Sequence, residues 1–417
     1  MMFVCRPNRV RIPLDLGPVT VRDDASECAL ADTDLSAKAL DEIWAATQAL
    51  YRSGYHPMVS IALRRRGKLV LNRSLGHRIG AGPDERDAAE LANPDTPVCL
   101  FSASKAISAM LAHKLVENGV IRLEDRVADY IPEYGVNGKH LTTVRELLAH
   151  RAGIPRIPMK RPDPEILFDW DGAVRLLAQA KPLMPTGTSQ AYHAITAGYV
   201  IGELVRRASG RELRPLLRQW IAEPLGCRFM DFGIAQEHRG LVAHNAFTGR
   251  RPGLVLNTAA RRVLGIEFER VAELSNADGF HNAIIPAGNI YASADEMCRF
   301  YQMMLDGGRW GERQLFTPET IAQATRPFGR LRIDRSLMLP MRFSAGFMLG
   351  ESPIGMYGPN CPQAFGHLGF MSIYGWADPA RDISVSILTT GKSVAIGSLV
   401  PVMRLLSAIN RSCTPVA

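Results

Sequence analysis

The apolar residues near the start of the chain first follow a helical spacing and then alternate. Between residues 40 and 51 they recur every three or four positions, which predicts an amphipathic helix. In the next stretch, HPMVSIALRRRGKLVLNRSLG, apolar side chains alternate at Val59, Ile61 and Leu63, a turn falls at Gly67, and apolar residues resume after it. This pattern predicts a β-hairpin that follows the helix.

The middle of the chain is patterned mainly as helices. Helical spacing of apolar residues, interrupted by glycines and prolines, covers 105–118, 143–151, 173–180, 195–208 and 211–222. Residues 240–285 are rich in arginine and only weakly periodic, so they predict no definite element.

Strand patterns return near the end of the chain. The stretches GFMSIYGWADP and ISVSILTTG predict two strands joined by a turn at residues 378–382. Leu399, Met403, Leu406 and Ile409 then share one face of a predicted final helix.

This order of elements predicts an α/β (α+β) fold. Strands at both ends with helices between them indicate an antiparallel sheet flanked by helices, built from both chain ends, with an inserted, mainly helical domain. We expect residues 1–105 and 276–417 to form the two parts of the α/β domain and residues 106–275 to form the helical domain. The length of 417 residues suffices for one large domain or two closely packed ones.

Composition and charge are those of an ordinary globular protein, with 47% hydrophobic and 22% charged residues. The formal net charge is +8, and it comes from an excess of arginine. The basic residues are scattered along the chain, and their densest run, Arg64 to Arg66, adjoins the predicted hairpin turn, where we expect them to be solvated. Nucleic acid binding requires a clustered basic face, so we expect no nucleic acid partner.

No targeting or membrane-spanning pattern is present in the sequence. The opening MMFVCRPNRVRIPLDL lacks the apolar run of a signal peptide, and no stretch approaches the ~18 apolar residues of a membrane span. We therefore expect a cytoplasmic protein without an integral membrane segment, while the basic charge leaves loose membrane contact open. Seven widely spaced cysteines without a C-x-x-C pair predict free thiols, not a disulfide framework or a zinc site.

The stretch LFSASKAIS carries candidate chemistry. Ser102 and Lys105 are three residues apart, so on a helix they lie on one face. A serine needs a neighbouring base to act as a nucleophile, and lysine serves as that base only if its pKa falls. The alternative is an ordinary first-turn serine with a surface lysine. Lysine is scarce in this chain and an apolar stretch follows Lys105, which favours the catalytic interpretation.

Two other catalytic or binding motifs are excluded by the sequence. No G-x-S-x-G is present, so the signature of the α/β-hydrolases is missing. The stretch TTGKS at residues 389–393 ends like a P-loop but lacks the earlier glycine that a P-loop requires. We interpret it as a turn at a strand end.

Five blocks in a fixed order resemble one protein family. They are CLFSASKAISAMLAHKLVENGVIRLEDRVADYIPEY, LTTVRELLAHRAGIP, AYHAITAGYVIGELVRRASGRELRPLLRQWIAEPLG, PAGNIYASADEMCRFYQMMLDGG and FGHLGFMSIYGWADP. Spread over about residues 54–392, they resemble the serine β-lactamase-like hydrolases, and among these the class C β-lactamases and the family VIII carboxylesterases. Several ordered blocks are far more specific than one motif.

The resemblance implies roles for individual residues. Ser102 matches the nucleophile, Lys105 its partner, and Tyr192 the first residue of the family's Y-x-N. His367 stands at the position of the lysine in K-T-G and Gly369 at that of its glycine. The oxyanion hole would consist of the backbone amides of Ser102 and of Phe370, the residue after Gly369. The resemblance implies no cofactor and no metal.

The identity of the general base stays open at this point. Tyr192 could act as a phenolate beside a protonated Lys105, or Lys105 could itself take the proton. Of the neighbouring histidines, we expect His150 to be structural and His193 to face away from the site or line its rim. The position of residues 240–285 in the family suggests that they shape an acyl pocket.

Two departures from the family pattern bear on the substrate. Y-x-N has become Tyr-His-Ala, and K-T-G has become His-Leu-Gly, so an amide and a fixed cation are missing. Both changes weaken a β-lactamase or D-peptidase function but leave ester chemistry intact. We therefore expect a serine carboxylesterase, lipase-like in type, that cleaves small or medium acyl esters through an acyl-enzyme on Ser102. Alternatives are an acyltransferase, a weak β-lactamase or D-peptidase, and a binding protein that keeps only the fold; the oligomeric state is open.

Overall fold

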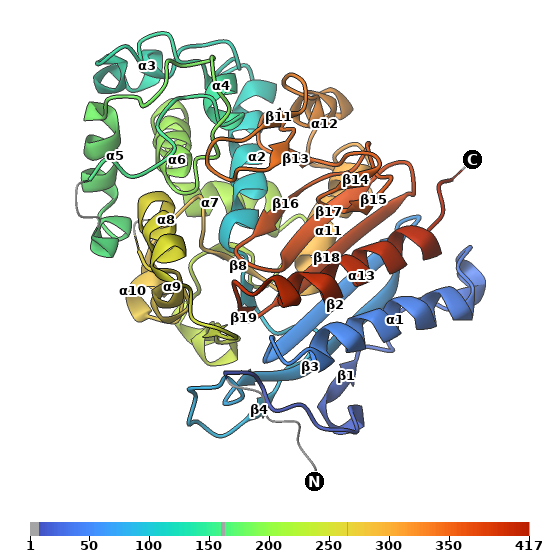
Figure 1. Cartoon of the computed structure of the whole chain (residues 1–417). Coiled ribbons are helices and arrows are strands. Elements are labelled where there is room, and N and C mark those ends of the chain that lie inside the picture. The colour runs from blue at the N-terminus through green and yellow to red at the C-terminus, as the bar shows by residue number, and fades with distance from the viewer. Residues whose placement is uncertain (1–7, 160–162, 265, 417) are drawn as a thin grey trace.

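The centre of the molecule is one antiparallel sheet made from both ends of the chain (Figure 1). The computed structural model describes residues 8–159, 163–264 and 266–416. The strand order is β1-β3-β2-β18-β17-β16-β13, with β4 paired to β3. The strands are β1 (Thr20–Arg22), β2 (Met58–Arg65), β3 (Lys68–Ile79), β4 (Glu90–Leu91), β13 (Met348–Leu349), β16 (Phe365–Gly369), β17 (Ile373–Asp378) and β18 (Ile383–Thr389).

The pairing of β2 with β18 joins the two ends of the chain in the middle of the sheet. Residues 59–65 of β2 pair with residues 383–389 of β18, while the β2–β3 hairpin turns at Gly67 as the sequence predicts. The turn between β17 and β18 is also confirmed at residues 379–382. The predicted fold class, an antiparallel sheet with flanking helices, is therefore confirmed.

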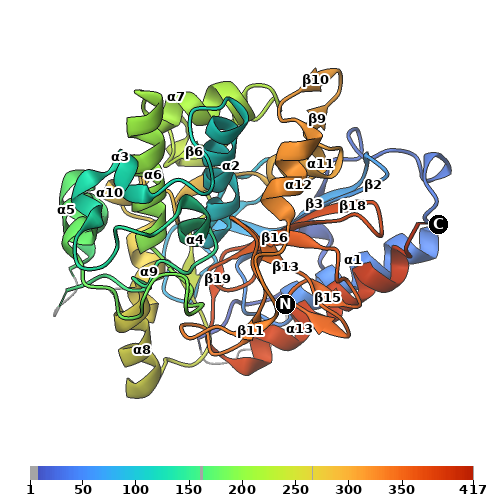
Figure 2. The same ribbon diagram turned by 90° about the horizontal axis from the view of Figure 1, so that it is seen from above.

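Helices cover both faces of the sheet (Figures 1 and 2). On one face α1 (Ala37–Arg52) packs beside α13 (Ile396–Ser412), and on the other α11 (Ala294–Leu305) lies across β2, β17 and β18. The side chain of Ser36 caps α1 by accepting a hydrogen bond from the Ala39 amide. In α13 only part of the predicted apolar face is buried: Leu406 and Ile409 pack in the core, whereas Leu399 and Met403 are exposed.

The middle of the chain forms a group of helices beside the sheet. The predicted helices at 105–118, 173–180, 195–208 and 211–222 are confirmed, although the last ends in a π-helical turn at Arg218–Ala222. The helices are α2 (Ser104–Glu117), α3 (Val127–Tyr130), α4 (Val144–Leu148), α5 (Trp170–Gln179), α6 (Thr196–Ser209), α7 (Leu213–Leu217), α8 (Leu254–Leu264), α9 (Phe268–Ser275) and α10 (Asp278–Asn282). Helix α4 is shorter than predicted because His150 adopts a left-handed conformation, with φ +59°.

Small sheets and loops complete the described structure. Strand β8 (Ile290–Ala292) lies between β5 (Val98–Cys99) and β6 (Asp231–Phe232), and β7 (Ala246–Phe247) pairs with β19 (Gly391–Lys392). The remaining strands and α-helix are β9 (Arg309–Trp310), β10 (Arg313–Gln314), α12 (Pro318–Thr325), β11 (Arg332–Ile333), β12 (Pro340–Met341), β14 (Ile354–Gly355) and β15 (Gly358–Pro359). The stretch TTGKS thus runs from the end of β18 through β19.

The expectation that the Arg64–Arg66 run is solvated is wrong for two of its three residues. Arg64 and Arg65 end β2 and are buried, and only Arg66 lies in the exposed turn. Arg64 forms an ion pair of 2.6 Å with Asp295 of α11, and Arg65 forms one with Asp34. Two arginines are therefore part of the packing between the sheet and its flanking elements.

Membrane and thiol predictions can be compared only over the described residues. No helix in that part of the chain has both the length and the apolar character needed to cross a membrane. Six cysteines are described and all six are free thiols, as the sequence predicts. Cys5 lies outside the described residues, as does the start of the N-terminal stretch.

Candidate active site

Ser102 and Lys105 meet at the start of α2. Ser102 lies in a 3-10 turn, Phe101–Ala103, directly before the helix, and Lys105 lies in the first turn of the helix. The Lys105 Nζ atom donates hydrogen bonds to Ser102 Oγ and to the Ala287 carbonyl oxygen, each at 3.0 Å. Phe101 has a left-handed φ of +46°, a conformation that costs a non-glycine residue energy and is frequent at functional sites.

The environment of Lys105 favours the uncharged amine. The side chain is buried, and its Nζ atom lies 4.9 Å from the centre of the Tyr192 ring. Burial lowers the pKa of Lys105 well below its usual value. A neutral amine 3.0 Å from Ser102 Oγ can accept the proton of the hydroxyl. This is what a general base for a serine nucleophile must do.

Tyr192 is fixed beside this pair through its backbone. Its amide donates a 3.0 Å hydrogen bond to Asp334, and the same carboxylate oxygen accepts from the Ser336 and Leu337 amides. Burial raises the pKa of Tyr192, while the nearby Ser102 hydroxyl lowers it by less and Asp334 raises it further. The phenolate form considered from the sequence is therefore disfavoured, and Tyr192 is a neutral phenol.

His367 reaches the same centre from β16. One of its ring nitrogens, Nδ1, lies 2.8 Å from the Leu368 carbonyl oxygen and is assigned as the N–H donor. The other, Nε2, is buried and has no hydrogen-bond partner among the described residues. Burial, and then the nearby Lys105, lower the pKa of His367 to about 3. The ring is therefore neutral and does not supply the cation that K-T-G would place there.

Gly369 brings the turn after β16 against the serine. A Cβ atom at this position would lie 2.3 Å from the Leu100 carbonyl oxygen and 2.8 Å from Ile373 Cβ, so only glycine allows the approach. The rings of Phe370 and Phe101 lie 5.6 Å apart across it. The turn at Phe370 therefore lies next to Ser102, where the resemblance places the second oxyanion amide.

The two other histidines near the site are neutral. His193 Nδ1 lies 2.6 Å from the Ala191 carbonyl oxygen and its Nε2 accepts from the Ile154 amide, and burial lowers the pKa of His193 to about 4. His150 accepts from the His193 amide and packs edge-on against Tyr192, with ring centres 4.7 Å apart. His193 therefore ties two loops together, and His150 supports the Tyr192 ring.

An apolar cleft opens at Ser102. It holds about 500 Å³ of empty space, its open mouth included. The lining residues are Phe101, Ser102, Leu167, Ile195, Leu264, Ile266, Val271, Leu274, Phe280, Ile285, Ala287, Gly288 and Phe370. Six of them come from the 240–285 segment, whose helices α8 to α10 thus form one wall of the cleft.

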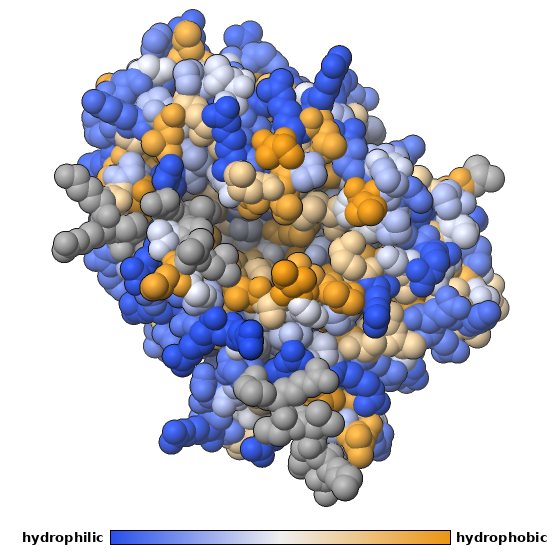
Figure 3. Space-filling view, in the orientation of Figure 1, coloured by the Kyte–Doolittle hydropathy of each residue, from blue (hydrophilic) through white to orange (hydrophobic). Residues whose placement is uncertain are grey.

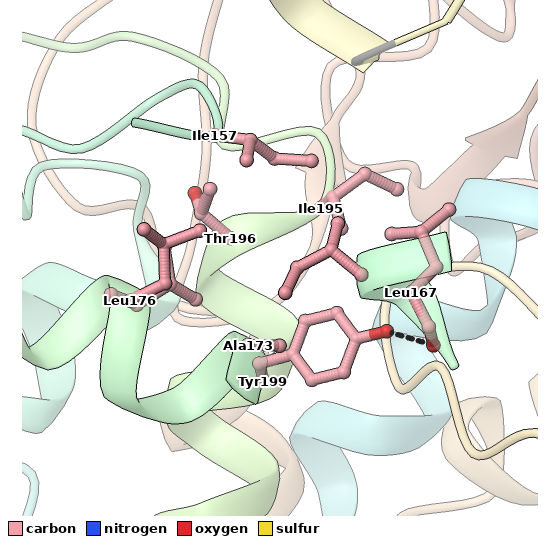
Figure 4. Close-up of a pocket in the computed structure, with 9 residues that line it drawn as sticks. Ile157, Leu167, Ala173, Leu176, Ile195, Thr196 and Tyr199 are labelled. Atoms are coloured by element: carbon pink, nitrogen blue, oxygen red, sulfur yellow. Dashed lines mark hydrogen bonds between the residues drawn. The ribbon is translucent and has the colours of Figure 1, made fainter. Parts of the chain in front are cut away.

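A second apolar pocket, with about 230 Å³ of empty space including its open side, lies beside this cleft and shares two of its lining residues, Leu167 and Ile195 (Figure 4). Tyr199 closes its floor and donates a 2.7 Å hydrogen bond to the Leu167 carbonyl oxygen. The space beyond Ser102 is therefore divided by two aliphatic side chains.

The Beta-lactamase family model matches residues 40–396. This chain belongs to the beta-lactamase family. It is 30% identical over 305 residues to Esterase/beta-lactamase LipL from Mycobacterium tuberculosis. The matched region covers 70% of this chain and 69% of that protein. It is 25% identical over 337 residues to Esterase EstB from Burkholderia gladioli, covering 75% and 82% of the two chains.

Two solved structures are similar to this chain in fold as well as in sequence. A penicillin-binding protein homolog from Caulobacter crescentus is 28% identical, with a TM-score of 0.79 over 91% of this chain and 99% of the other. A family VIII carboxylesterase is 25% identical, with a TM-score of 0.78 over the same shares. The family resemblance predicted from the ordered blocks is therefore confirmed.

The sequence did not predict that a second buried lysine, Lys392, lies close to the site. Lys392 donates a 2.8 Å hydrogen bond to the Thr389 carbonyl oxygen, and its Nζ atom lies 4.8 Å from the centre of the Phe101 ring. Burial lowers the pKa of Lys392 to about 7. Among the described residues, no cluster of three histidine, cysteine, aspartate or glutamate side chains could hold a metal ion.

Proposed function

We propose that this chain is a serine ester hydrolase that cleaves carboxylic esters with an apolar acyl group through an acyl-enzyme on Ser102. The observation that carries the proposal is the 3.0 Å contact between Lys105 Nζ and Ser102 Oγ at the edge of an apolar cleft. The printed names of two relatives, an esterase/beta-lactamase and an esterase, support the same chemistry, as does the family VIII carboxylesterase structure.

In the first half-reaction, neutral Lys105 accepts the Ser102 proton while Oγ bonds to the ester carbonyl carbon. The carbonyl electron pair moves to oxygen, and the backbone amides of Ser102 and Phe370 stabilise the negative charge. When the carbonyl re-forms, the bond to the alcohol breaks and the departing oxygen takes a proton. We assign that proton to neutral Tyr192, whose ring centre lies 4.9 Å from Lys105 Nζ and which then recovers a proton from Lys105.

In the second half-reaction, water takes the place of the serine as the nucleophile. Lys105 accepts a proton from water as its oxygen bonds to the acyl carbon, and the same two amides hold the negative charge. Collapse breaks the bond to Ser102 Oγ, which takes back its proton, and the carboxylic acid leaves. Each proton taken by Lys105 is returned, so the enzyme ends in its starting state.

The site favours esters over β-lactams and peptides with a free carboxylate. Those substrates carry a negative charge that K-T-G would meet with lysine, whereas here the pKa of His367 is lowered to about 3. No charged residue lines the cleft within the described part of the chain.

We retain the domain boundaries at 105 and 275 as part of this proposal, so that Ser102, Tyr192 and His367 come from three successive segments of the chain.

The test compares the purified protein with a Ser102→Ala variant and a Ser209→Ala control on p-nitrophenyl acetate, butyrate and octanoate. We expect hydrolysis by the wild type and by the control, and a loss of at least ~10³-fold in the Ser102→Ala variant. Equal rates in all three proteins, or none in any, would contradict the proposal. Nitrocefin turnover exceeding ester turnover would favour a β-lactamase, and ester products that form mainly with an added alcohol would favour an acyltransferase.

A further inference from the structure

Three surface segments around the cleft expose an unusual number of large apolar side chains. Nine of the seventeen exposed large hydrophobic residues of the described chain lie in segments 249–264, 326–341 and 394–404, which together hold 43 residues. They are Leu254, Leu331, Ile333, Met338, Leu339, Ile396, Leu399, Val400 and Met403. The most exposed are Leu254 at 89%, Ile396 at 82% and Met338 at 72%. We call these three segments the rim.

The rim segments face the same side of the molecule. Helix α8, strand β11 and the start of α13 lie along the lower edge of Figure 2, which is the side facing the viewer in Figure 1. Figure 3 shows apolar residues gathered around a hollow in the middle of that side. Monomeric soluble proteins rarely expose large apolar patches unless the patch is a contact surface.

Each rim segment is attached to the candidate active site. Helix α8 ends in Leu264, which lines the cleft. The β11–β12 hairpin contains Asp334, which binds the Tyr192 amide. Helix α13 follows Lys392, whose amine lies over the Phe101 ring. A surface that contacts the rim would therefore lie at the entrance to the cleft.

The start of α13 shows that the exposure is patterned. Ile396, Leu399, Val400 and Met403 follow the spacing i, i+3, i+4, i+7, which places them on one face of the helix. All four are exposed, while Leu405 on the opposite face is buried in the core. A helix with an apolar stripe on its solvent side is typical of a segment that meets an apolar partner.

The rim also carries the whole positive excess of the protein. It contains nine arginines and one carboxylate, Asp334. Removing these from the 49 basic and 41 acidic residues of the chain leaves forty of each. The carboxylate is buried and accepts backbone hydrogen bonds, so it does not face solvent. Most basic residues are scattered over the rest of the chain, where acidic residues balance them in number.

We propose that the rim docks on an anionic membrane surface, with its aliphatic side chains at the boundary of headgroups and acyl chains and its arginines on lipid phosphates. Apolar burial combined with attraction to anionic lipid is how surface-bound proteins hold membranes. A second copy of this chain is disfavoured because two positive rims repel each other. Nucleic acid is disfavoured because the exposed rim residues are aliphatic, whereas single strands bind through aromatic stacking.

Docking would present the cleft to esters held in the lipid phase. This consequence rests on the proposed function, whereas the docking itself does not, because it involves no reacting group. Binding and hydrolysis are therefore measured separately.

The test is co-sedimentation of the full chain with sucrose-loaded vesicles of phosphatidylcholine alone or with 30% phosphatidylglycerol. We expect binding to the anionic vesicles, weakening as salt rises because screening shortens the range of the attraction. The double variant Arg330→Gln and Arg332→Gln should bind about 25-fold more weakly, at about fivefold per arginine. The apolar variant Ile333→Ser, Met338→Ser and Ile396→Ser should lose binding as well.

The matched control carries the same kinds of change outside the rim, at Ile354→Ser, which is 72% exposed, and at exposed Arg211→Gln and Arg313→Gln. It should bind like the wild type. All variants should hydrolyse p-nitrophenyl acetate at wild-type rates, which shows that they are folded. Equal binding to both kinds of vesicle, or equal losses in rim and control variants, would overturn the proposal. So would a dimer in light scattering that the apolar variant dissociates, or binding of an oligonucleotide without binding of vesicles.

Discussion

Gly369→Ala tests whether the close approach of two backbone segments positions the oxyanion hole. The added Cβ would lie 2.3 Å from the Leu100 carbonyl oxygen and 2.8 Å from Ile373 Cβ. Carbon and oxygen atoms in close contact are separated by about 3.3 Å, so the strand end must move by about 1 Å. Leu100 is buried and its amide is bonded to Ile290, so the Phe370 turn is the part that moves.

A movement of that size has a predictable effect on rate. Misplacing a catalytic group by about 1 Å costs about 10²-fold, and losing one oxyanion donor costs about 10²–10³-fold. We expect kcat of Gly369→Ala on p-nitrophenyl butyrate to fall by about 10²–10³-fold, with a much smaller change in KM. Overpacking should also lower the free energy of unfolding by about 1–3 kcal/mol.

Two other glycines separate these effects. At Gly240 a Cβ atom meets nothing within 4 Å, so Gly240→Ala should change neither rate nor stability. At Gly350 it would lie 2.0 Å from the Cys361 carbonyl oxygen, so Gly350→Ala should destabilise the fold and spare kcat. Kinetics and thermal unfolding are measured on all three. A folded Gly369→Ala enzyme that keeps a third or more of wild-type kcat would refute the reasoning.

Three further predictions concern the site and its surroundings. Tyr192→Phe removes the proton donor to the leaving alcohol and should lower kcat about 10²–10⁴-fold in steady-state assays; a variant that keeps a tenth of wild-type kcat would exclude this role. Lys392→Met tests a buried amine whose pKa is lowered to about 7. The unfolded chain protonates this amine below about pH 10.5, whereas the folded protein does so only near pH 7, so the free energy of unfolding of the wild type should rise between pH 7 and 10. Urea unfolding over this range should show a smaller rise for the variant. Leu167→Ala joins the cleft to the pocket beside it and should raise the octanoate-to-butyrate ratio of kcat/KM, whereas Leu204→Ala, a buried leucine of α6 that lines neither space, should leave that ratio unchanged.

The parts of the fold that could be predicted are those whose partners lie nearby in the sequence. The β2–β3 hairpin and the contact of Ser102 with Lys105 depend on spacings of a few residues, so local periodicity sufficed. The environment of Arg64 depends on Asp295, more than two hundred residues away, and no local pattern indicates that partner. Residues 240–285 predicted no definite element because their helices α8, α9 and α10 are short, with 11, 8 and 5 residues, so each offers few apolar repeats.

The protonation state of the site depends on burial, which spacing alone does not reveal. The resemblance left open whether Tyr192 or Lys105 takes the proton, and desolvation favours the lysine because it lowers the pKa of the amine and raises that of the phenol. His150, His193 and His367 follow the same rule, since burial keeps each of them neutral. A centre that rests without formal charge can lie at the bottom of an apolar cleft without a counter-ion. In the proposed mechanism charge develops as the serine attacks, and the resemblance implies that two backbone amides would stabilise it.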